Sequence, residues 1–348
     1  MTIDVADFCA TLQQDLADLA GANYKAMARE QTGYLDSLVS ADNRAGFSQE
    51  LQLDGGDGKN KQVIVRYIQP GVYSETADTS VNICTDAGEE VTETRKVEDV
   101  TRFKRSPTLT FTNAALRDLC DAPSEYRAKV LATRMSALFR SINRDLIALA
   151  NAAAGIHLGG DATATDLNLI VNNVAGGGQI QADYTGEVDL LEEMADLGVM
   201  NPIVVGAGNL SRYSRLQGIG CCNDYGQAVD QFGAFQFYRD RDVPSVIGAA
   251  NNFLAYAPGA CQLVTWNANK GEFAMNHEHF AHTTLVDPVT GLELDFEMNY
   301  DNCDKVWKIG LSLNYDLFTL PVDMFKDADE RDQINYLWKF NATEFTPA

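Results

Sequence analysis

The sequence predicts an α+β protein in which one long helix and an antiparallel hairpin accompany a mixed region of strands and short helices. The first observation is a strict alternation of apolar and polar residues on both sides of a polar turn, between Leu292 and Tyr315. The second is an apolar residue at every third or fourth position from Leu131 to Leu149. The third is a set of short apolar runs between residues 202 and 266. These patterns predict a hairpin with one buried face, an amphipathic helix and several short strands.

The first 50 residues predict a helix followed by an arm. Apolar residues recur at spacings of three and four on one helical face, with Asp4 suited to the N-cap and Gly21 to the stop. From there to Ser48 the chain is polar and irregular, so we expect residues 1–50 to form an arm that lies across another surface. The helical face consists of Val5, Phe8, Leu12, Leu16 and Leu19.

Residues 51–112 predict a long two-stranded excursion. Residues 63–68 and 91–103 have strand character, Pro107 ends the second strand, and a short strand around Phe111 follows. The stretch between the two strands is loop-like and acidic. Because an isolated hairpin is marginal in water, we expect this excursion to rest on another surface.

The excursion is sorted by charge, with an acidic far end and a basic return stem. One interpretation is a solvated surface strand, which charged runs usually are. The other is that the stem docks on an acidic face of a neighbouring copy, where complementary charge guides register. On the second interpretation, charge reversal at Arg102, Lys104 and Arg105 weakens assembly and leaves the fold of the subunit intact. The stem residues are Arg95, Lys96, Arg102, Lys104 and Arg105, and the acidic face offers Glu293, Asp295, Glu297, Asp301 and Asp304.

The best predicted helix begins at the start signal Asp121-Ala122-Pro123-Ser124 and ends at Gly155. About thirty residues at a rise of 1.5 Å make a rod of roughly 45 Å, long enough to cross a whole subunit. Beyond it, the sequence predicts a mixed lobe with helices at residues 188–197 and 210–216. Its expected strands are residues 202–205, 233–237, 243–247, 253–257 and 262–266.

Composition limits the classes of function. The chain has 348 residues, 45% of them hydrophobic, which is enough for two lobes. A formal net charge of -22 repels phosphate, so extensive binding of nucleic acid by an isolated subunit is disfavoured. No apolar stretch is long enough to predict a membrane-spanning helix. The seven cysteines are scattered, without metal-ligand spacing, and are expected to be reduced thiols.

Two motifs suggest chemistry without establishing it. The run Val204-Val205-Gly206-Ala207-Gly208 precedes an expected helix and is similar to a dinucleotide fingerprint, but Ser211 stands where the third glycine belongs. His277, His279 and His282 lie close together with Glu278 and Asp287 nearby, so whether they bind zinc or copper stays open. No P-loop or nucleophile elbow is present in the sequence. We therefore expect no enzyme, no cofactor and no catalytic residue.

The order of these parts resembles that of the major capsid proteins of tailed bacteriophages, which have the Hong Kong 97-type fold. The residues that carry the resemblance are 131–149, 203–216 and 291–321, the last ending in Asn314-Tyr315-Asp316-Leu317-Phe318. The resemblance implies an N-terminal arm at residues 1–50 and an extended E-loop at 51–112. It implies a P-domain of residues 113–157 and 287–348, which holds the spine helix and closing strands, and an A-domain at 158–286.

The resemblance also implies a function. The expected protein is a structural subunit that assembles into pentamers and hexamers of an icosahedral phage head enclosing double-stranded DNA, located in the virion and assembled in the host cytoplasm. Implied partners are further copies of the chain, a separate scaffold protein, a portal and decoration proteins, with packaged DNA not specifically bound and no membrane. The alternatives are a nucleotide-binding α/β enzyme and the shell of an encapsulin-type compartment.

Overall fold

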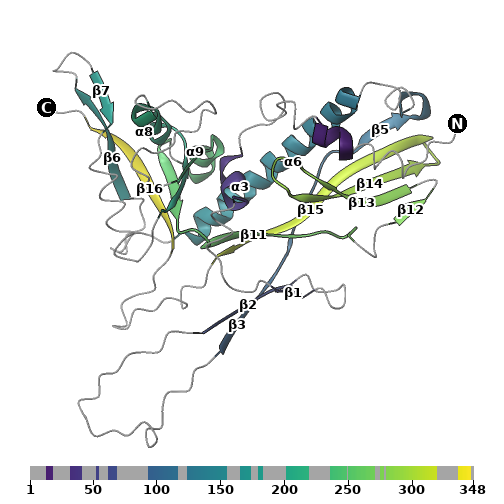
Figure 1. Ribbon diagram of the computed structural model, residues 1–348, viewed down its shortest axis with the longest axis horizontal. Helices are drawn as coiled ribbons and strands as arrows, with labels where there is room; N and C mark the ends of the chain where they lie inside the picture. Colours follow the sequence, from purple (N-terminus) through teal and green to yellow (C-terminus); the bar gives the residue numbers. More distant parts are fainter. Residues whose placement is uncertain are drawn as a thin grey trace, which may run out of the picture.

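The computed structural model describes residues 13–18, 32–40, 52–54, 62–68, 93–116, 124–154, 165–173, 179–182, 201–218, 236–248, 250–270, 275–277, 280–319 and 336–345. These residues form a body with two sheets and a long helix, and a small separate sheet that extends away from the body (Figure 1). No helix in the described ranges is both long and apolar enough to span a membrane.

The long helix α6, Ser124–Ala153, has 30 residues and confirms the helix expected from the sequence. Its apolar stripe is buried, including Leu131, Met135, Leu138 and Ile142. The helix lies along the larger sheet and reaches toward the smaller one (Figure 1). It therefore connects the two halves of the body through one hydrophobic core.

The larger sheet has the order β11-β15-β14-β13-β12 and is antiparallel throughout. Its central strand β15 also pairs with two short strands, β4 and β5, on the side away from β14. The 14-residue β15 thus pairs with four strands. From its N-terminal end, β14 and then β11 pair along one side, and β5 and then β4 pair along the other. The bounds are β4 Arg102–Arg105, β5 Leu109–Thr112, β11 Cys261–Trp266, β12 Met275–His277, β13 Phe280–Val286, β14 Glu293–Asp301 and β15 Val306–Thr319.

The alternating ladder forms the predicted hairpin of β14 and β15. Phe296 and Met298 on β14 lie opposite Leu311 and Ile309 on β15, and all four are buried. The expectation of a single buried face is wrong at one place, because Asp295, Ser312 and Asn314 on the other face are buried too. The backbone at residues 268 and 269 covers Asp295 by donating two hydrogen bonds to it.

The smaller sheet has the order β7-β6-β16-β10-β8-β9. Strand β16 pairs in parallel with β6, and β8 with β9, whereas the other neighbours are antiparallel. Strand β16 belongs to this sheet because it pairs with β6 and β10. The domain division expected from the sequence instead grouped residues 287–348 with the long helix. The bounds are β6 Thr165–Asn173, β7 Gln179–Ala182, β8 Ile203–Gly206, β9 Gln236–Arg239, β10 Asn252–Tyr256 and β16 Leu337–Phe345.

Two short helices differ from expectation. Residues 243–247, expected as a strand, lie in helix α9, Asp242–Ile247, where the Ser245 hydroxyl bonds the Asp242 carbonyl and Gly248 ends the helix with φ 92°. Within the expected irregular arm, residues 33–38 form helix α3, Gly33–Leu38. Tyr34, Leu35 and Leu38 of α3 belong to the main core, so this part of the N-terminal segment is packed into the body of its own chain. Helix α8, Asn209–Gly218, matches the expected helix.

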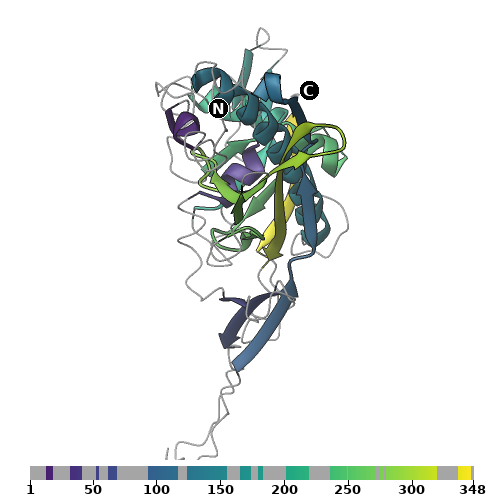
Figure 2. The same ribbon diagram turned by 90° about the vertical axis from the view of Figure 1, so that its right-hand side faces the viewer.

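The excursion forms a separate antiparallel sheet with the order β1-β2-β3. Its bounds are β1 Gln52–Asp54, β2 Gln62–Ile68 and β3 Glu93–Asp99. It therefore has one more strand than the sequence predicted, and its acidic far end at residues 71–90 lies outside the described residues. Both views show this sheet extending below the body, joined to it where β3 leads into β4 (Figures 1 and 2).

Candidate assembly surface and its anchoring network

The excursion is attached to the body at the start of β4. Only Val100 and Thr101 separate β3 from β4, and Val100 is buried. The Thr101 backbone N–H and hydroxyl both donate to Oδ2 of Asp316 on β15, each at 3.3 Å. The antiparallel pairing of β4 with β15 begins at Arg102, opposite Tyr315. The base of the excursion is therefore fixed to the central strand of the larger sheet.

Ion pairs hold β4 from both faces of the sheet. Lys104 Nζ lies 3.0 Å from Oδ2 of Asp145 on α6, on the face that the helix covers. Arg105 Nη2 lies 2.8 Å from Oε2 of Glu297 on β14, and its guanidinium crosses β15 at Gly310, where a Cβ would come within 3.0 Å of it. Because Gly310 has no side chain, Arg105 can extend from β4 across β15 and reach Glu297 on β14.

The residues expected to contact a neighbouring copy are mostly engaged within the chain. Arg102, Lys104 and Arg105 pair with Asp316, Asp145 and Glu297, and Glu293 pairs with Lys270 at 2.6 Å. Charge reversal at these three cations would therefore break three ion pairs inside the subunit as well as any contact with a neighbouring copy. The contact between copies itself stays a prediction.

The remaining predicted contact residues divide into two groups. Asp295 is 1% exposed and accepts backbone hydrogen bonds from Ala268 and Asn269, so it is a structural residue of the body. Arg95 and Lys96 lie on β3, in register with Arg66 and Val65 of β2. These two cations stand on the extended sheet, beyond the ion pairs at its base.

Asp145 joins the base of the excursion to α6. Its Oδ2 accepts a hydrogen bond of 2.7 Å from the Tyr315 hydroxyl as well as the contact from Lys104. Burial acts to raise the pKa of Asp145, but the hydrogen bonds from Tyr315 and Lys104 outweigh it and lower that pKa. Burial and the Asp145 contact raise the pKa of Tyr315 far above its usual range. The site thus favours an ionised carboxylate.

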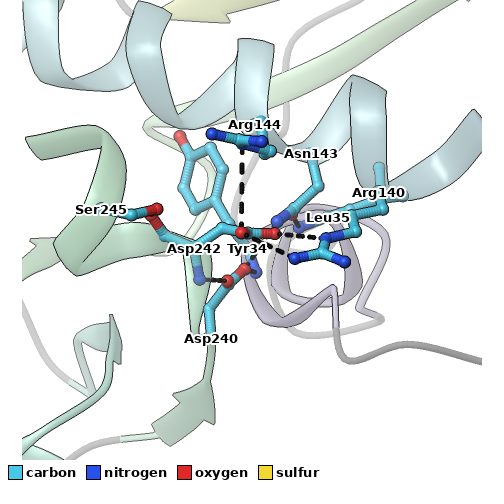
Figure 3. A network of polar contacts seen from close by, with 8 residues as sticks. All are labelled: Tyr34, Leu35, Arg140, Asn143, Arg144, Asp240, Asp242 and Ser245. Atoms are coloured by element: carbon cyan, nitrogen blue, oxygen red, sulfur yellow. Dashed lines mark hydrogen bonds and ion pairs between the residues drawn. The ribbon is translucent and has the colours of Figure 1, made fainter. Parts of the chain in front are cut away.

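A second polar network, shown in Figure 3, holds helix α3 in the body. Oδ2 of Asp240 accepts hydrogen bonds from the Tyr34 backbone N–H at 2.9 Å and from Asn143 Nδ2 at 2.8 Å. Oδ1 of Asn143, on α6, accepts the Leu35 backbone N–H at 2.8 Å. Asn143 of α6 and Asp240, in the connection between β9 and α9, therefore cap the first turn of α3, where unpaired N–H groups would otherwise be buried.

Charge in this network is divided between two aspartates. Asp240 is fully buried and accepts only N–H donors, including the Asp242 backbone N–H at 2.8 Å. Burial raises its pKa, although the three donors act in the opposite direction. Asp242 instead meets the guanidinium groups of Arg140 and Arg144 at 3.3 and 4.0 Å (Figure 3). The network ties α3, α6 and α9 together.

The contacts of α3 are close enough to require specific residues. A Cβ on Gly33 would lie 2.3 Å from the carbonyl oxygen of Arg239, so only glycine fits. Tyr34 packs edge-on against Tyr256, whose hydroxyl donates to Ser37 at 2.6 Å. Sequence reasoning missed this network. Its one available signal was Asn143, a polar residue within the apolar stripe of the long helix.

The dinucleotide-like motif is occupied by the chain itself. Gly208 has φ +63°, and a Cβ there would lie 2.6 Å from the Ala250 carbonyl oxygen. A Cβ on Gly206 would lie equally close to Cβ of Phe253. The Asn251 side chain accepts from the Asn209 backbone N–H at the start of α8. Packing and capping explain these glycines, and the first turn of the helix faces the chain's own loop where a phosphate would have to bind.

The histidine cluster lies partly outside the described residues. His282 contacts the Asn299 side-chain oxygen through Nε2 at 3.0 Å. His277 ends β12, and neither its side chain nor residue 279 is described. Among the described residues, no group of three or more potential ligands could hold a metal ion.

Cys261 is a buried cysteine of the core. Burial raises the pKa of its thiol to about 12, which makes it a poor nucleophile.

Comparisons with known proteins give only likenesses of fold. No family model matches the chain, and no curated protein sequence matches it. The chain is similar to the structure titled "Cyanophage A-1(L) capsid asymmetric unit", with TM-score 0.47 and 12% identity over 81% of this chain and 88% of that one. It is similar to "Capsid of Ralstonia phage GP4", with TM-score 0.45 and 11% identity over 92% and 94% of the two chains. It is also similar to a chain of "Mycobacterium phage Adephagia", with TM-score 0.46 and 9% identity over 95% and 98%.

Proposed function

We propose that this chain is a structural subunit of a closed protein shell, the major capsid protein of a tailed phage. The observation that carries the proposal is the sheet of β1, β2 and β3. Among the described residues it pairs with no other sheet, and it extends away from the body (Figure 2). Sheets are stabilised by burying a face against another layer, so such an element is best explained by a surface that another copy provides.

The design of its base supports the same role. An extended element that carries load between copies must be held firmly at one end. Here β4 is hydrogen-bonded to β15 as a strand, and its side chains form ion pairs with α6 and with β14. The body behind it is continuous, because α6 and both sheets share buried residues such as Met135, Leu254 and Leu311. The excursion therefore has a rigid foundation in the body.

In the finer form of the proposal, copies associate as pentamers and hexamers of an icosahedral head that encloses double-stranded DNA. The net charge of -22 suits a wall beside packed DNA, because the wall repels phosphate. Arg95 and Lys96, on the extended sheet, are the cations proposed to meet an acidic face of a neighbouring copy. A scaffold protein, a portal and decoration proteins are the further proposed partners, and the virion is the proposed location.

The experiment is electron microscopy and sedimentation of the purified full-length protein over a range of protein concentration and salt. The proposal expects pentamers, hexamers or closed particles whose formation depends on concentration. A small oligomer of fixed size at all concentrations, with a nucleotide bound near residues 206–211, would contradict it. Analysis of particle contents then separates a phage head, which holds DNA, from an encapsulin-type shell, which holds protein cargo.

A further inference from the structure

The larger sheet has terminal strands on both sides, and two of them, on opposite sides of the sheet, are unpaired on their outer edge among the described strands. One edge is β12, which pairs only with β13, and the other is β4, which pairs only with β15. An unpaired edge presents backbone N–H and C=O groups that another strand can bind. The two edges therefore offer two halves of a possible ladder on one molecule.

The exposed apolar residues mark the same two edges. Phe103 on β4 and Met275 on β12 are the two large apolar residues exposed in the described part of the chain, each 55% exposed. Met275 lies opposite His282, which lies opposite Glu297, which lies opposite Gly310. Phe103 lies opposite Asn314, an even number of residues along β15 from Gly310. Because side chains alternate along a strand, Phe103 and Met275 stand on the same face of the sheet.

We infer that the β4 edge of one copy pairs with the β12 edge of the next, so that the larger sheet continues from subunit to subunit. This inference rests on the proposed function and names the partner of these edges as a second copy of this chain. Four antiparallel steps separate β4 from β12, so the two strands run in the same direction. A copy displaced sideways without being turned over thus forms a parallel ladder and keeps the same face outward.

The pairing brings together two different exposed apolar residues, one from each edge. The row of residues that contains Met275 crosses β15 at Gly310, four residues from Asn314, which lies opposite Phe103. A copy shifted by four residues along the strand direction therefore brings its Phe103 beside Met275 of the next copy, and thioether sulfur packs well against an aromatic ring. A heterologous contact of this kind joins different surfaces of identical copies, and it closes into rings when the rotation between copies allows. Both strands are short, and β4 has three cations in four residues, features that limit uncontrolled edge association.

The test is cross-linking in assembled full-length protein with paired cysteines. In F103C/M275C, oxidation is expected to give a ladder of covalently linked copies on a non-reducing gel. The matched control is F103C/A148C, because Ala148 is exposed on α6, which covers the opposite face. Wild-type protein measures the background from native cysteines such as the exposed Cys303. Particles that form without a link in F103C/M275C, or with equal linking in the control, would overturn this contact and leave the proposed function standing.

A second measurement does not depend on new cysteines. F103S and M275S each change one exposed residue, so the thermal midpoint of the dissociated subunit is expected to stay at the wild-type value. The concentration needed for assembly is expected to rise roughly two- to tenfold, the range that a sulfur–aromatic contact supports. Wild-type assembly by both serine variants would overturn the inference. Wild-type protein that never assembles would overturn the proposed function and this contact together.

Discussion

Asp240 and Asp145 show how burial and partners act on one residue type in opposite directions. Asp240 has three N–H donors and no cation in contact among the described residues, and burial raises its pKa. Asp145 is a third exposed, and hydrogen bonds from Tyr315 and Lys104 lower its pKa. The first carboxylate costs free energy to keep ionised, whereas the second gains from being ionised. Their effects on stability should therefore have opposite dependence on pH.

The substitution D240N is expected to lower the free energy of unfolding by roughly 1–3 kcal/mol at neutral pH, because an amide cannot accept from all three donors. The pH dependence follows from the raised pKa. The folded state binds this proton more tightly than the unfolded chain, so wild type gains stability relative to D240N as pH falls through the folded-state pKa toward 3.8. Urea unfolding of both proteins across this range measures the difference, and a constant difference would contradict the assignment.

The substitution D145N is expected to cost about 0.5–1 kcal/mol at neutral pH, since it removes a partly exposed ion pair with Lys104 and keeps an acceptor for Tyr315. A folded-state pKa below 3.8 means that this stabilisation is present above pH 3.8 and is lost as pH falls through the lowered value. The difference between wild type and D145N should shrink in acid, opposite to D240N. Thermal unfolding of the two variants in parallel makes each the control of the other.

Two glycines test how far packing restricts a single residue. G33A would place a Cβ 2.3 Å from a backbone oxygen that cannot move alone, so a loss of roughly 1–3 kcal/mol is expected. G310A would meet only the end of the Arg105 side chain at 3.0 Å, which can shift, so its loss should be smaller. Chemical denaturation gives both values. Equal losses would show that the α3 contact is looser than described.

At the scale of elements, α6 is the member on which both sheets depend. L138P removes a backbone hydrogen bond in the helix interior and clashes with the preceding turn, at a cost of about 3 kcal/mol or more. It also replaces a residue that is 3% exposed in the core. We expect insoluble or unfolded protein. The exposed substitution A148G should cost only about 1 kcal/mol and leave a soluble fold, and circular dichroism of the soluble fractions distinguishes the two.

Elements with strong periodicity could be predicted from the sequence. The stripe from Leu131 to Leu149 gave α6 with nearly its true bounds, and the alternation from Leu292 to Tyr315 gave the β14–β15 hairpin. Helix α3 could not be predicted, because its six residues span fewer than two helical turns and show no repeated pattern. Its N–H groups are also capped by Asn143 and Asp240, far away in sequence. The strand expected at residues 243–247 was wrong because Pro244 and a following glycine signalled α9 more strongly than two valines signalled a strand.

The strand character of the basic stem could be predicted from the sequence and is confirmed for β3 and β4, while its contact with a neighbouring copy stays a prediction. What charge alone could not reveal is which cations the body itself uses. The partners Asp145 and Asp316 belong to elements that the fold brings beside Lys104 and Arg102. Opposite charges in a sequence predict that the residues attract one another. Whether they pair within a subunit or between subunits depends on the fold, which cannot be read from the charges.

At the scale of the whole molecule, the excursion should be separable from the body. Gln62 and Asp99 are cross-strand partners, so a short glycine-serine loop can join them in place of residues 63–98. Because β2 and β3 pair with no described strand of the body, we expect the thermal midpoint of the body to be unchanged and closed particles to be lost. Calorimetry and electron microscopy measure the two. Normal particles from the shortened chain would contradict the proposed role of the excursion.

The path of the chain from β3 into β4 has a mechanical consequence. A pull on the excursion is transmitted along β4, whose neighbour β15 runs antiparallel to it over four paired residues. Tension applied along a strand shears its hydrogen bonds together, whereas tension across a strand opens them one at a time. Arg105 and Lys104 add cross-braces to β14 and α6. In the proposed shell, tension on the excursion would therefore load the β4–β15 ladder and these two ion pairs together.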